Sequence, residues 1–333
     1  MSASAFRAEL QRVADALTST FPAEELRPDE PTGWKNPEYR LTIGAMKRTL
    51  NWSLACLAVL ALAGPAAARA DPKAGCDRAC LTHVLDRYLQ HVLARRPDPS
   101  LLAAHPNIRE NTLAVALDRG VWRSLVRKRA GWIFADPEAG QIAFAGVFDD
   151  RAGGLTPLFV RLKVEHGRVA ESEVAFNNGP SPFFHPEALL EPDVLYDAPV
   201  PPNRRSSREA LVRVAGLYLD GIAARSGAKV PIGDRCDKYY LGGKVTNAGV
   251  PGIGTCRESF DGVKADAPVG RRFPIVDVER GIVVVSFLMP QHYKDPPDST
   301  YECEILKVVD GKIRQVEEFG NTAAYLAHSG FGP

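Results

Sequence analysis

The chain contains an internal repeat, which constrains the fold most because both halves must supply the same elements in the same order. The first half opens with CDRACLTHVLDRYLQHVLARRPD and the second with SSREALVRVAGLYLDGIAARSG. Apolar residues recur at helical spacing in both stretches, and Tyr88-Leu89 in the first matches Tyr218-Leu219 in the second. We therefore expect one long amphipathic helix at the start of each half.

A second match lies later in each half and begins with a turn. Residues 134–148 read FADPEAGQIAFAGVF, and residues 275–289 read IVDVERGIVVVSFLM. Each contains Asp-x-Glu-x-Gly followed by a strand pattern. Because the acidic residues of this motif recur in both copies, we interpret them as turn residues that serve the fold and not as catalytic groups.

The match ends with a β-hairpin in each half. Residues 161–174, RLKVEHGRVAESEV, parallel residues 305–318, ILKVVDGKIRQVEE. His166-Gly167 and Asp310-Gly311 stand between β-branched runs, and Asp-Gly is a strong signal for a two-residue hairpin turn. Each half is thus predicted to contain a helix, an irregular middle, a strand and a terminal hairpin.

These elements predict an α+β fold of two tandem cone-like repeats, each a long helix packed on a curved antiparallel sheet. The helix would cap the concave face of the sheet and enclose a pocket. The segment 177–205 is loop-rich and marks the expected boundary, so we assign residues 71–200 to the first repeat and 201–333 to the second. We expect a monomer with pseudo-dimeric repeats or a homodimer.

Residues 46–70 have the layout of a secretory signal peptide. Lys47 and Arg48 precede an apolar run over residues 53–64, which is too short for a membrane-spanning helix of about 20 residues. Ala68-Arg69-Ala70 supplies the small-x-small pattern before a cleavage site. We expect cleavage after Ala70 and a periplasmic or extracellular mature protein.

Residues 1–45 precede this signal and are interpreted as a non-native or disordered extension. On the simplest hypothesis, translation starts at Met46, and the alternative is an unusually long region before the apolar run. In both cases the mature chain would begin at Asp71.

Charge and missing motifs argue against several function classes. The formal net charge is +1 and no basic block is interleaved with aromatic residues, which argues against a nucleic-acid partner. After signal cleavage we expect no membrane association. The sequence lacks a Walker loop, GxSxG, HExxH and GxGxxG, which argues against nucleotide-dependent, serine-hydrolase and zincin mechanisms. We expect no cofactor, no metal site, and a small-molecule partner that is apolar or carries a carboxylate.

Five cysteines follow the signal segment, and an oxidising compartment favours disulfides. Cys236 and Cys256 bracket a Gly-rich loop, and we predict a disulfide between them. Cys76 and Cys80 are one helical turn apart, so their direct pairing stays open. Cys303 lies in a strand pattern and is predicted to be a buried free thiol.

Several stretches resemble known families. The LKVxxG wording in each half is similar to the final hairpin of the nuclear transport factor 2-like superfamily, which includes ketosteroid isomerase and the SnoaL-like cyclases. CDRACL, ADPEAGQ, LFVRLKVEHGRVAESE, RRFPIVDVERG and LKVVDGKI resemble a family of secreted fungal and bacterial proteins of unknown function, over residues 76–325. For an enzyme, the resemblance implies cofactor-independent proton transfer, as in an isomerase, dehydratase or lyase. The alternatives are a non-catalytic periplasmic binding protein and a structural or interaction module.

Candidate site residues of the first half follow its helix and surround the first expected strand, TLAVAL. In HPNIREN, His105 and Glu110 are candidate catalytic groups, and Asn111 is a candidate binding group. Trp122 and Trp132 could supply apolar walls of a pocket. The alternative for HPNIREN, which we favour, is a solvated loop in which Asn111 forms a turn.

The second half offers a carboxylate pair on one strand. Along residues 300–308, Glu302 and Glu304 share one face, and the matched positions of the first half hold Leu158 and Val160. On a concave face, one carboxylate could act as a general base and the other as an acid with a raised pKa. On a convex face they would form an ordinary solvated edge, which is the interpretation that we favour.

Arg272 and His292 complete the candidate binding residues. The pair Arg271-Arg272 could bind a carboxylate-bearing ligand, although ion pairs with Asp277 or Glu279 are the favoured alternative. His292 ends a strand pattern and could shuttle protons, whereas a plain surface position is the favoured alternative.

Overall fold

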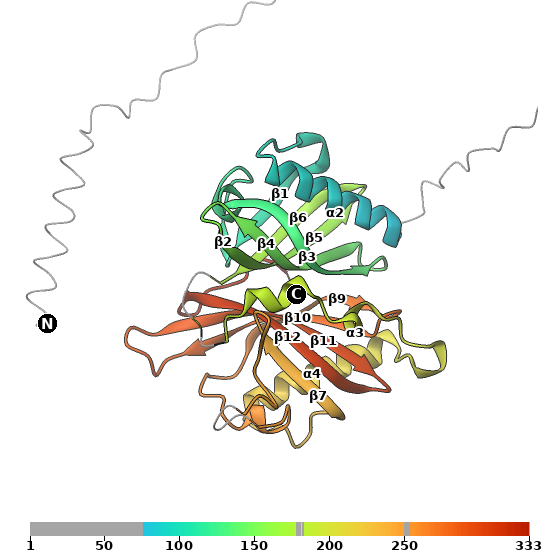
Figure 1. Ribbon diagram of the computed structural model, residues 1–333, viewed down its shortest axis with the longest axis vertical. Coiled ribbons are helices and arrows are strands. Elements are labelled where there is room, and N and C mark those ends of the chain that lie inside the picture. Colours follow the sequence, from blue (N-terminus) through green and yellow to red (C-terminus); the bar gives the residue numbers. More distant parts are fainter. Residues whose placement is uncertain (1–75, 178–180, 182, 250–253, 333) are drawn as a thin grey trace, which may run out of the picture. The chain divides into compact units, whose positions relative to one another are not determined.

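The computed structural model describes residues 76–177, 181, 183–249 and 254–332 (Figure 1). The expected signal peptide with its cleavage site, and the extension 1–45 before it, lie outside the described residues. Within the described chain, no helix is both long enough and apolar enough to cross a membrane.

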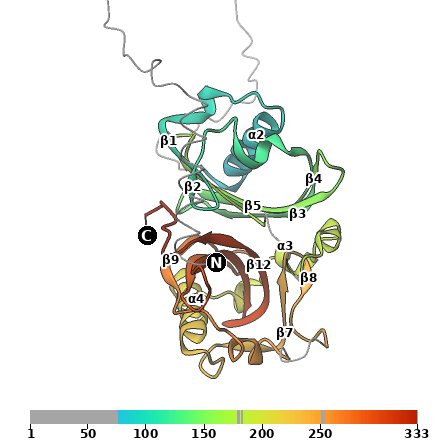
Figure 2. The ribbon, with the colours of Figure 1, turned by 90° about the vertical axis from the view of Figure 1, so that its left-hand side faces the viewer.

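Two six-stranded sheets form the described fold, and they share one strand order (Figures 1 and 2). The first has the order β2-β1-β6-β5-β4-β3 and the second β8-β7-β12-β11-β10-β9. The first sheet consists of β1 (Leu102–Glu110), β2 (Leu113–Ala114), β3 (Leu125–Asp136), β4 (Gln141–Asp150), β5 (Leu155–Glu165) and β6 (Arg168–Phe176). The second consists of β7 (Ile232–Tyr240), β8 (Gly243–Lys244), β9 (Val269–Asp277), β10 (Ile282–Gln291), β11 (Asp298–Val309) and β12 (Lys312–Ala324).

Three α-helices lie in the described chain, and the two long ones confirm the expected helices. The α-helices are α2 (Arg78–Leu93), α3 (Val194–Asp197) and α4 (Arg208–Ala224). Capping side chains start the long helices: Asp77 accepts the Cys80 N–H at 2.8 Å, and Ser207 accepts the Ala210 N–H at 3.3 Å. Short 3₁₀ helices are η1 (Pro99–Leu101), η2 (Gly120–Arg123), η3 (Pro186–Leu190), η4 (Pro202–Arg204) and η5 (Glu258–Phe260).

The expected fold class, helix-on-sheet α+β cone repeats, is wrong. The described residues are mostly β, with six strands in each sheet where we expected one strand and a hairpin. Neither sheet is purely antiparallel, because β1 pairs in parallel with β6 and β7 pairs in parallel with β12. The missed strands β1, β3, β7 and β9 contain Pro, Gly or several charged residues. Long-range pairing makes them strands against their weak local propensity.

Both predicted hairpins are confirmed. His166-Gly167 joins β5 to β6, and Asp310-Gly311 joins β11 to β12. All four turn residues have positive φ, at 53° and 74° in the first turn and 54° and 70° in the second. Positive φ at both central positions is the type I′ geometry, whose twist matches that of the flanking strands.

Each sheet is buried on both faces. One face packs against the helix of the same half, as in the core that contains Leu85 of α2 and Val160 of β5. The helix α4 forms the equivalent core with the second sheet. A third core contains side chains of both sheets, including Phe159 and Phe319, whose ring centroids are 6.4 Å apart.

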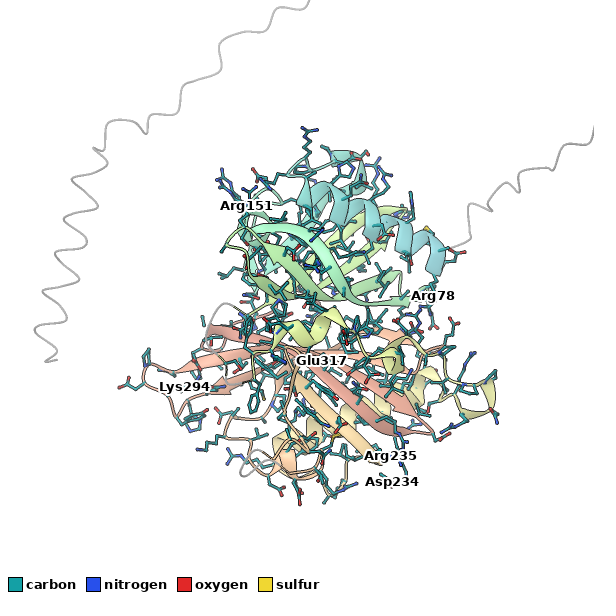
Figure 3. All side chains as sticks on the ribbon, viewed as in Figure 1. Arg78, Arg151, Asp234, Arg235, Lys294 and Glu317 are labelled. Carbon is teal, nitrogen blue, oxygen red and sulfur yellow. A yellow bond between two sulfur atoms is a disulfide. The ribbon has the colours of Figure 1, made fainter. Side chains whose placement is uncertain are left out.

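Two reciprocal ion pairs join the halves. Arg208, at the start of α4, binds both carboxylate oxygens of Asp136 at the end of β3, with contacts of 3.0 and 2.6 Å. Arg78, at the start of α2 and labelled in Figure 3, binds Asp277 at the end of β9, with contacts of 2.9 and 2.8 Å. Each aspartate also accepts a backbone N–H within its own turn. The recurring Asp therefore serves the turn, as expected, and also the contact between halves.

The cysteines form two disulfides. The predicted bridge between Cys236 and Cys256 is confirmed, and a second bridge joins Cys76 to Cys80. Cys303 is a buried free thiol, as predicted.

Candidate functional site

Four ionisable side chains gather on the face of the second sheet that packs against α4. They are Lys238 of β7, Glu302 and Glu304 of β11, and Glu318 of β12, which we call the α4 cluster. Glu304 lies directly opposite Glu318 in the strand pairing. The three glutamates expose only 4%, 2% and 9% of their surface. The favoured interpretation of Glu302 and Glu304 as a solvated edge is therefore wrong.

The fold itself does not require these charges. The register assigns each cluster residue a counterpart in the first sheet, and Val160 pairs with Val174 as Glu304 pairs with Glu318. In the order Lys238, Glu302, Glu304 and Glu318, the counterparts are Ile108, Leu158, Val160 and Val174. All four counterparts are apolar. Because burying ionisable groups costs free energy, ionisable groups at these four positions of one sheet and apolar groups at the matching positions of the other indicate a role beyond folding.

An ion pair and two hydrogen bonds connect the cluster to α4. Lys238 Nζ forms an ion pair with Glu318 and donates to the Tyr218 hydroxyl at 3.1 Å. Tyr218, on α4, donates in turn to Glu304 Oε2 at 2.5 Å. A continuous polar path thus runs from Glu318 through Lys238 and Tyr218 to Glu304. Glu302 lies outside this path, and its Oε2 has no hydrogen-bond partner among the described residues.

Burial sets the protonation states of the cluster. Burial, with repulsion from Glu318 and Glu304, raises the pKa of Glu302 well above its ordinary value. Burial and Glu318 raise the pKa of Glu304 to about 8, against the opposing effects of Lys238 and Tyr218. Burial acts to lower the pKa of Lys238, but attraction to Glu318 and Glu304 outweighs it and raises that pKa. Near neutral pH the cluster therefore holds two neutral carboxylic acids beside one ion pair.

A pocket of about 340 Å³ opens at the cluster. Its lining includes Lys238, Tyr240 and Glu318, together with Ser181, Phe183 and Ser259. The Tyr240 hydroxyl donates to the Gly320 carbonyl at 3.0 Å, which fixes its ring at the wall. The volume lies within the range of about 300–1,000 Å³ typical of small-molecule sites. No group of three or more His, Cys, Asp or Glu in the described ranges is arranged to hold a metal ion.

The Cys236–Cys256 disulfide holds two sides of this pocket together. Cys236 lies on β7, the strand that carries Lys238, and Cys256 precedes η5, which carries Ser259. The Thr246 hydroxyl accepts the Lys238 backbone N–H at 2.8 Å. The covalent link therefore fixes β7 relative to the segment that forms the opposite wall.

Residues 105–110 of HPNIREN belong to β1 and do not form the solvated loop that we favoured, whereas Asn111 lies in the turn after β1, as that interpretation expected. His105 is exposed on this strand. Of the expected strand TLAVAL, only Leu113–Ala114 is a strand. The sequence misplaces the strand because the pairing partner of β1, which is β6, lies far along the chain.

Glu110 and Asn111 lie at the end of β1, within the first half. Glu110 is 5% exposed and accepts the Val121 N–H at 2.8 Å, and burial raises its pKa to about 7. Asn111 has a φ of 47° and exchanges two hydrogen bonds of 3.0 Å with the backbone of Phe176. Asn111 thus holds β1 to β6, and the structure does not bring either residue to the α4 cluster.

The two tryptophans occupy different cores and do not share a pocket wall. Trp122 is 1% exposed in the core beneath α2, where its ring meets Tyr88 and Phe148 edge-on at 6.1 and 6.2 Å. Trp132 lies in the core between the sheets, and its Nε1 donates to the Asp193 carbonyl at 2.9 Å.

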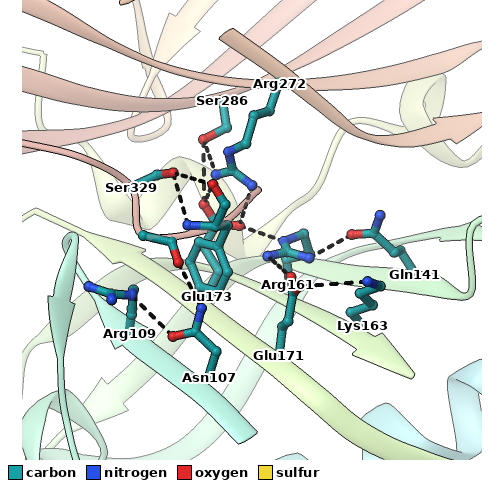
Figure 4. Close-up of polar contacts among 12 residues, drawn as sticks. Asn107, Arg109, Gln141, Arg161, Lys163, Glu171, Glu173, Arg272, Ser286 and Ser329 are labelled. Atoms are coloured by element: carbon teal, nitrogen blue, oxygen red, sulfur yellow. Dashed lines mark hydrogen bonds and ion pairs between the residues drawn. The ribbon is translucent and has the colours of Figure 1, made fainter. Parts of the chain in front are cut away.

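Arg272 and His292 are separate from each other and from the cluster. Arg272 forms an ion pair with Glu173 and donates to Ser286 at 2.8 Å (Figure 4). Neighbouring Arg271 pairs with Asp220. The favoured ion pairs with Asp277 or Glu279 are therefore wrong. His292 is exposed and its Nδ1 lies 2.8 Å from a carboxylate oxygen of Asp266.

The sequence misses four residues of the site, Tyr218, Lys238, Tyr240 and Glu318. One signal could have identified Glu318, because the alignment of residues 161–174 with residues 305–318 places the apolar Val174 at the matching position. Lys238 and Tyr240 lie on a strand that the sequence does not predict, so no pattern places them near the carboxylates. Tyr218 matches Tyr88 in the helix repeat, which marks it as a packing residue.

Comparison with known sequences places the α4 cluster inside one recognised segment. The profile of a family described as "Domain of unknown function (DUF8021)" matches residues 204–320. This segment contains α4 and all four cluster residues. No curated protein matches the chain with significance. The chain is thus similar over this segment to a family to which no function is attached.

Proposed function

We propose that the protein binds a small molecule in the pocket at the α4 cluster and transfers a proton to or from it without a cofactor. The reaction class would be isomerisation, dehydration or elimination. One observation carries the proposal: a buried acid–base cluster, absent from the matching sheet of the same chain, opens into a ligand-sized pocket. Clustered titratable groups with shifted pKa values are typical of functional sites.

Glu318 and Lys238 are the groups that a ligand would meet. Glu318 lines the pocket and forms an ion pair with Lys238, so in this proposal its carboxylate is the group that accepts a proton from a bound molecule. The negative charge would then pass to the ligand. Once Glu318 is protonated, Lys238 no longer faces a carboxylate of the protein there. Its positive charge can then stabilise the anion formed on the ligand, because electrostatic stabilisation is strong in a buried site.

Glu304 and Tyr218 supply a route for proton return: after the Lys238 ammonium gives a proton to the ligand anion, Tyr218 can pass its hydroxyl proton to the resulting amine and take a proton from Glu304. The hydroxyl of Tyr218 contacts both Lys238 Nζ and Glu304, so it bridges the pocket-lining pair and a neutral acid behind it. A carboxylic acid with a pKa of about 8 retains its proton near neutral pH and can serve as a donor. The groups interact strongly, so we expect them to titrate as one unit.

Export is part of the same proposal. The signal-like segment 46–70 motivates it, and two disulfides support it because such bonds persist in oxidising compartments. The proposed location is the periplasm or the extracellular medium.

The test combines ligand capture with proton exchange. Native mass spectrometry of the protein after exposure to a metabolite pool would identify a ligand, which is then incubated with the protein in D₂O. We expect deuterium in the recovered ligand or product with wild type, and retained capture but no deuterium with Glu318→Gln. Glu187→Gln is the matched control, because its side chain is 64% exposed away from the pocket lining.

Each other outcome contradicts a stated part of the proposal. Capture without deuterium uptake would refute catalysis and leave a binding protein. Absence of capture from any pool, with a folded protein, would refute the binding site and favour a structural or interaction module.

A further inference from the structure

A second pocket, of about 590 Å³, lies between the start of β9 and the C-terminal segment. It shares no lining residue with the pocket at the α4 cluster. Apolar side chains form much of its wall, among them Val269, Leu288 and Leu326. Val269 is 42% exposed and Leu326 is 55% exposed, although both are apolar. An apolar ligand would cover them and so remove this surface from water.

The charges of this pocket have one sign. Its lining includes Arg271, Arg272 and His328 and contains no acidic residue. Arg271 is paired with Asp220 on α4, and Arg272 is paired with Glu173 of β6, which does not line the pocket.

Arg272 is buried, and one of its donors meets no acceptor in the part of the chain that the structure describes. Its Nη2 contacts Glu173, Ser286 and Tyr301, and Arg161 shares the Glu173 carboxylate at 2.5 Å (Figure 4). Arg272 Nε has no hydrogen-bond partner among the described residues. A buried donor without an acceptor is unfavourable, so this guanidinium can gain from an additional acceptor.

The C-terminal segment covers this guanidinium. The Phe331 ring centroid lies 5.3 Å from the Arg272 Cζ and 4.7 Å from the Arg161 Cζ. Phe331 itself lines the pocket. A ligand that reaches Arg272 Nε therefore has to displace this ring, and an aliphatic chain can replace its apolar contacts.

We infer that this pocket binds an aliphatic carboxylate, with its chain against Val269, Leu288 and Leu326 and its carboxylate beside Arg272. A carboxylate matches the single sign of the lining charges and supplies the acceptor that the guanidinium lacks. The aliphatic chain matches the apolar wall. This site is independent of the proton-transfer site at the α4 cluster.

Calorimetry with octanoate and 1-octanol tests the inference on the intact protein. Both probes carry the same chain, so their difference reports the carboxylate. We expect octanoate to bind about tenfold more tightly than octanol. Val269→Asp replaces an apolar contact of the chain by a negative charge, so it should weaken both probes but octanoate about tenfold more than octanol. Val269→Asn is the matched neutral control and should keep octanoate binding within about threefold of wild type.

Several results would overturn the inference. Equal affinities for octanoate and octanol, or equal effects of Val269→Asp and Val269→Asn on octanoate binding, would show that the pocket does not recognise the carboxylate. Undetectable octanoate binding would remove the site. Loss of octanoate binding in Glu318→Gln would place the probe in the other pocket. Failure of the proton-transfer proposal would leave all of these measurements unaffected.

Discussion

The reciprocal ion pairs predict that loss of one arginine destabilises the fold. Arg208→Leu leaves the Asp136 carboxylate, whose side chain is 1% exposed, without the guanidinium that binds both its oxygens. Breaking a buried ion pair by removing one partner costs about 3–5 kcal/mol. Arg208 is itself 25% exposed, and Asp136 keeps the Val276 N–H at 2.9 Å. We therefore expect the free energy of unfolding to fall by about 3 kcal/mol, the lower end of that range.

The matched control is Arg204→Leu. Arg204 pairs with Asp310, but the two side chains are 48% and 52% exposed. Exposed ion pairs contribute about 0–1 kcal/mol, so this variant should unfold close to wild type. Urea unfolding would be followed by tryptophan fluorescence, which reports the cores around Trp122 and Trp132, and by circular dichroism, which reports both sheets.

A double variant separates the unpaired charge from the lost packing of the arginine stem. Arg208→Leu with Asp136→Asn removes the buried charge as well, so it should be more stable than Arg208→Leu alone. The reasoning is refuted if Arg208→Leu and Arg204→Leu lose equal stability, or if the double variant is less stable than Arg208→Leu.

Three further predictions concern Glu110, the pocket disulfide and Tyr218. Burial raises the folded-state pKa of Glu110 to about 7, so stability should fall as the pH rises from about 4.5 to 7, by at most about 3 kcal/mol. Glu110→Gln should remove this pH-dependent change in stability. A plot of urea midpoint against pH that is the same for the variant and for wild type would contradict the assignment. Cys236→Ser with Cys256→Ser releases a bridge between residues 20 positions apart and should cost about 3 kcal/mol in urea unfolding, whereas a loss below 1 kcal/mol would be too small for this role. Tyr218→Phe breaks the path from Lys238 to Glu304 and should slow deuterium uptake by the captured ligand about 100-fold without preventing capture, and an unchanged rate would exclude the relay.

Local sequence signals predicted the helices and hairpins but not the sheets. The stretch around Tyr88 carries its helical period and its cap within a few residues, and Asp310-Gly311 specifies its own turn. The strands β1 and β7 depend instead on parallel pairing with β6 and β12, which lie far along the chain. No local pattern in β7, with its Gly and alternating charges, identifies it as the neighbour of β12.

The candidate site was likewise predictable where the signal is local and not where it depends on long-range pairing. Glu302 and Glu304 were recognisable because they replace Leu158 and Val160 in the repeat. Their burial was not recognisable, because a carboxylate pair on a strand is more often solvated than covered by a helix. Lys238 comes from β7, which only the three-dimensional pairing brings beside Glu318.

The repeat offers one more test, because the first sheet shows what the second would contain if the cluster served only the fold. The variant that combines Tyr218→Phe, Lys238→Ile, Glu302→Leu, Glu304→Val and Glu318→Val gives each charged position its apolar counterpart and leaves no orphaned tyrosine hydroxyl. Replacing buried ionic groups by apolar residues of similar volume is often neutral or stabilising by about 1–4 kcal/mol. We expect this variant to unfold at a higher urea concentration than wild type and to lose deuterium uptake, since natural sites often lower stability for function. A folded wild type that is more stable than the variant by several kcal/mol would show instead that the cluster is structural.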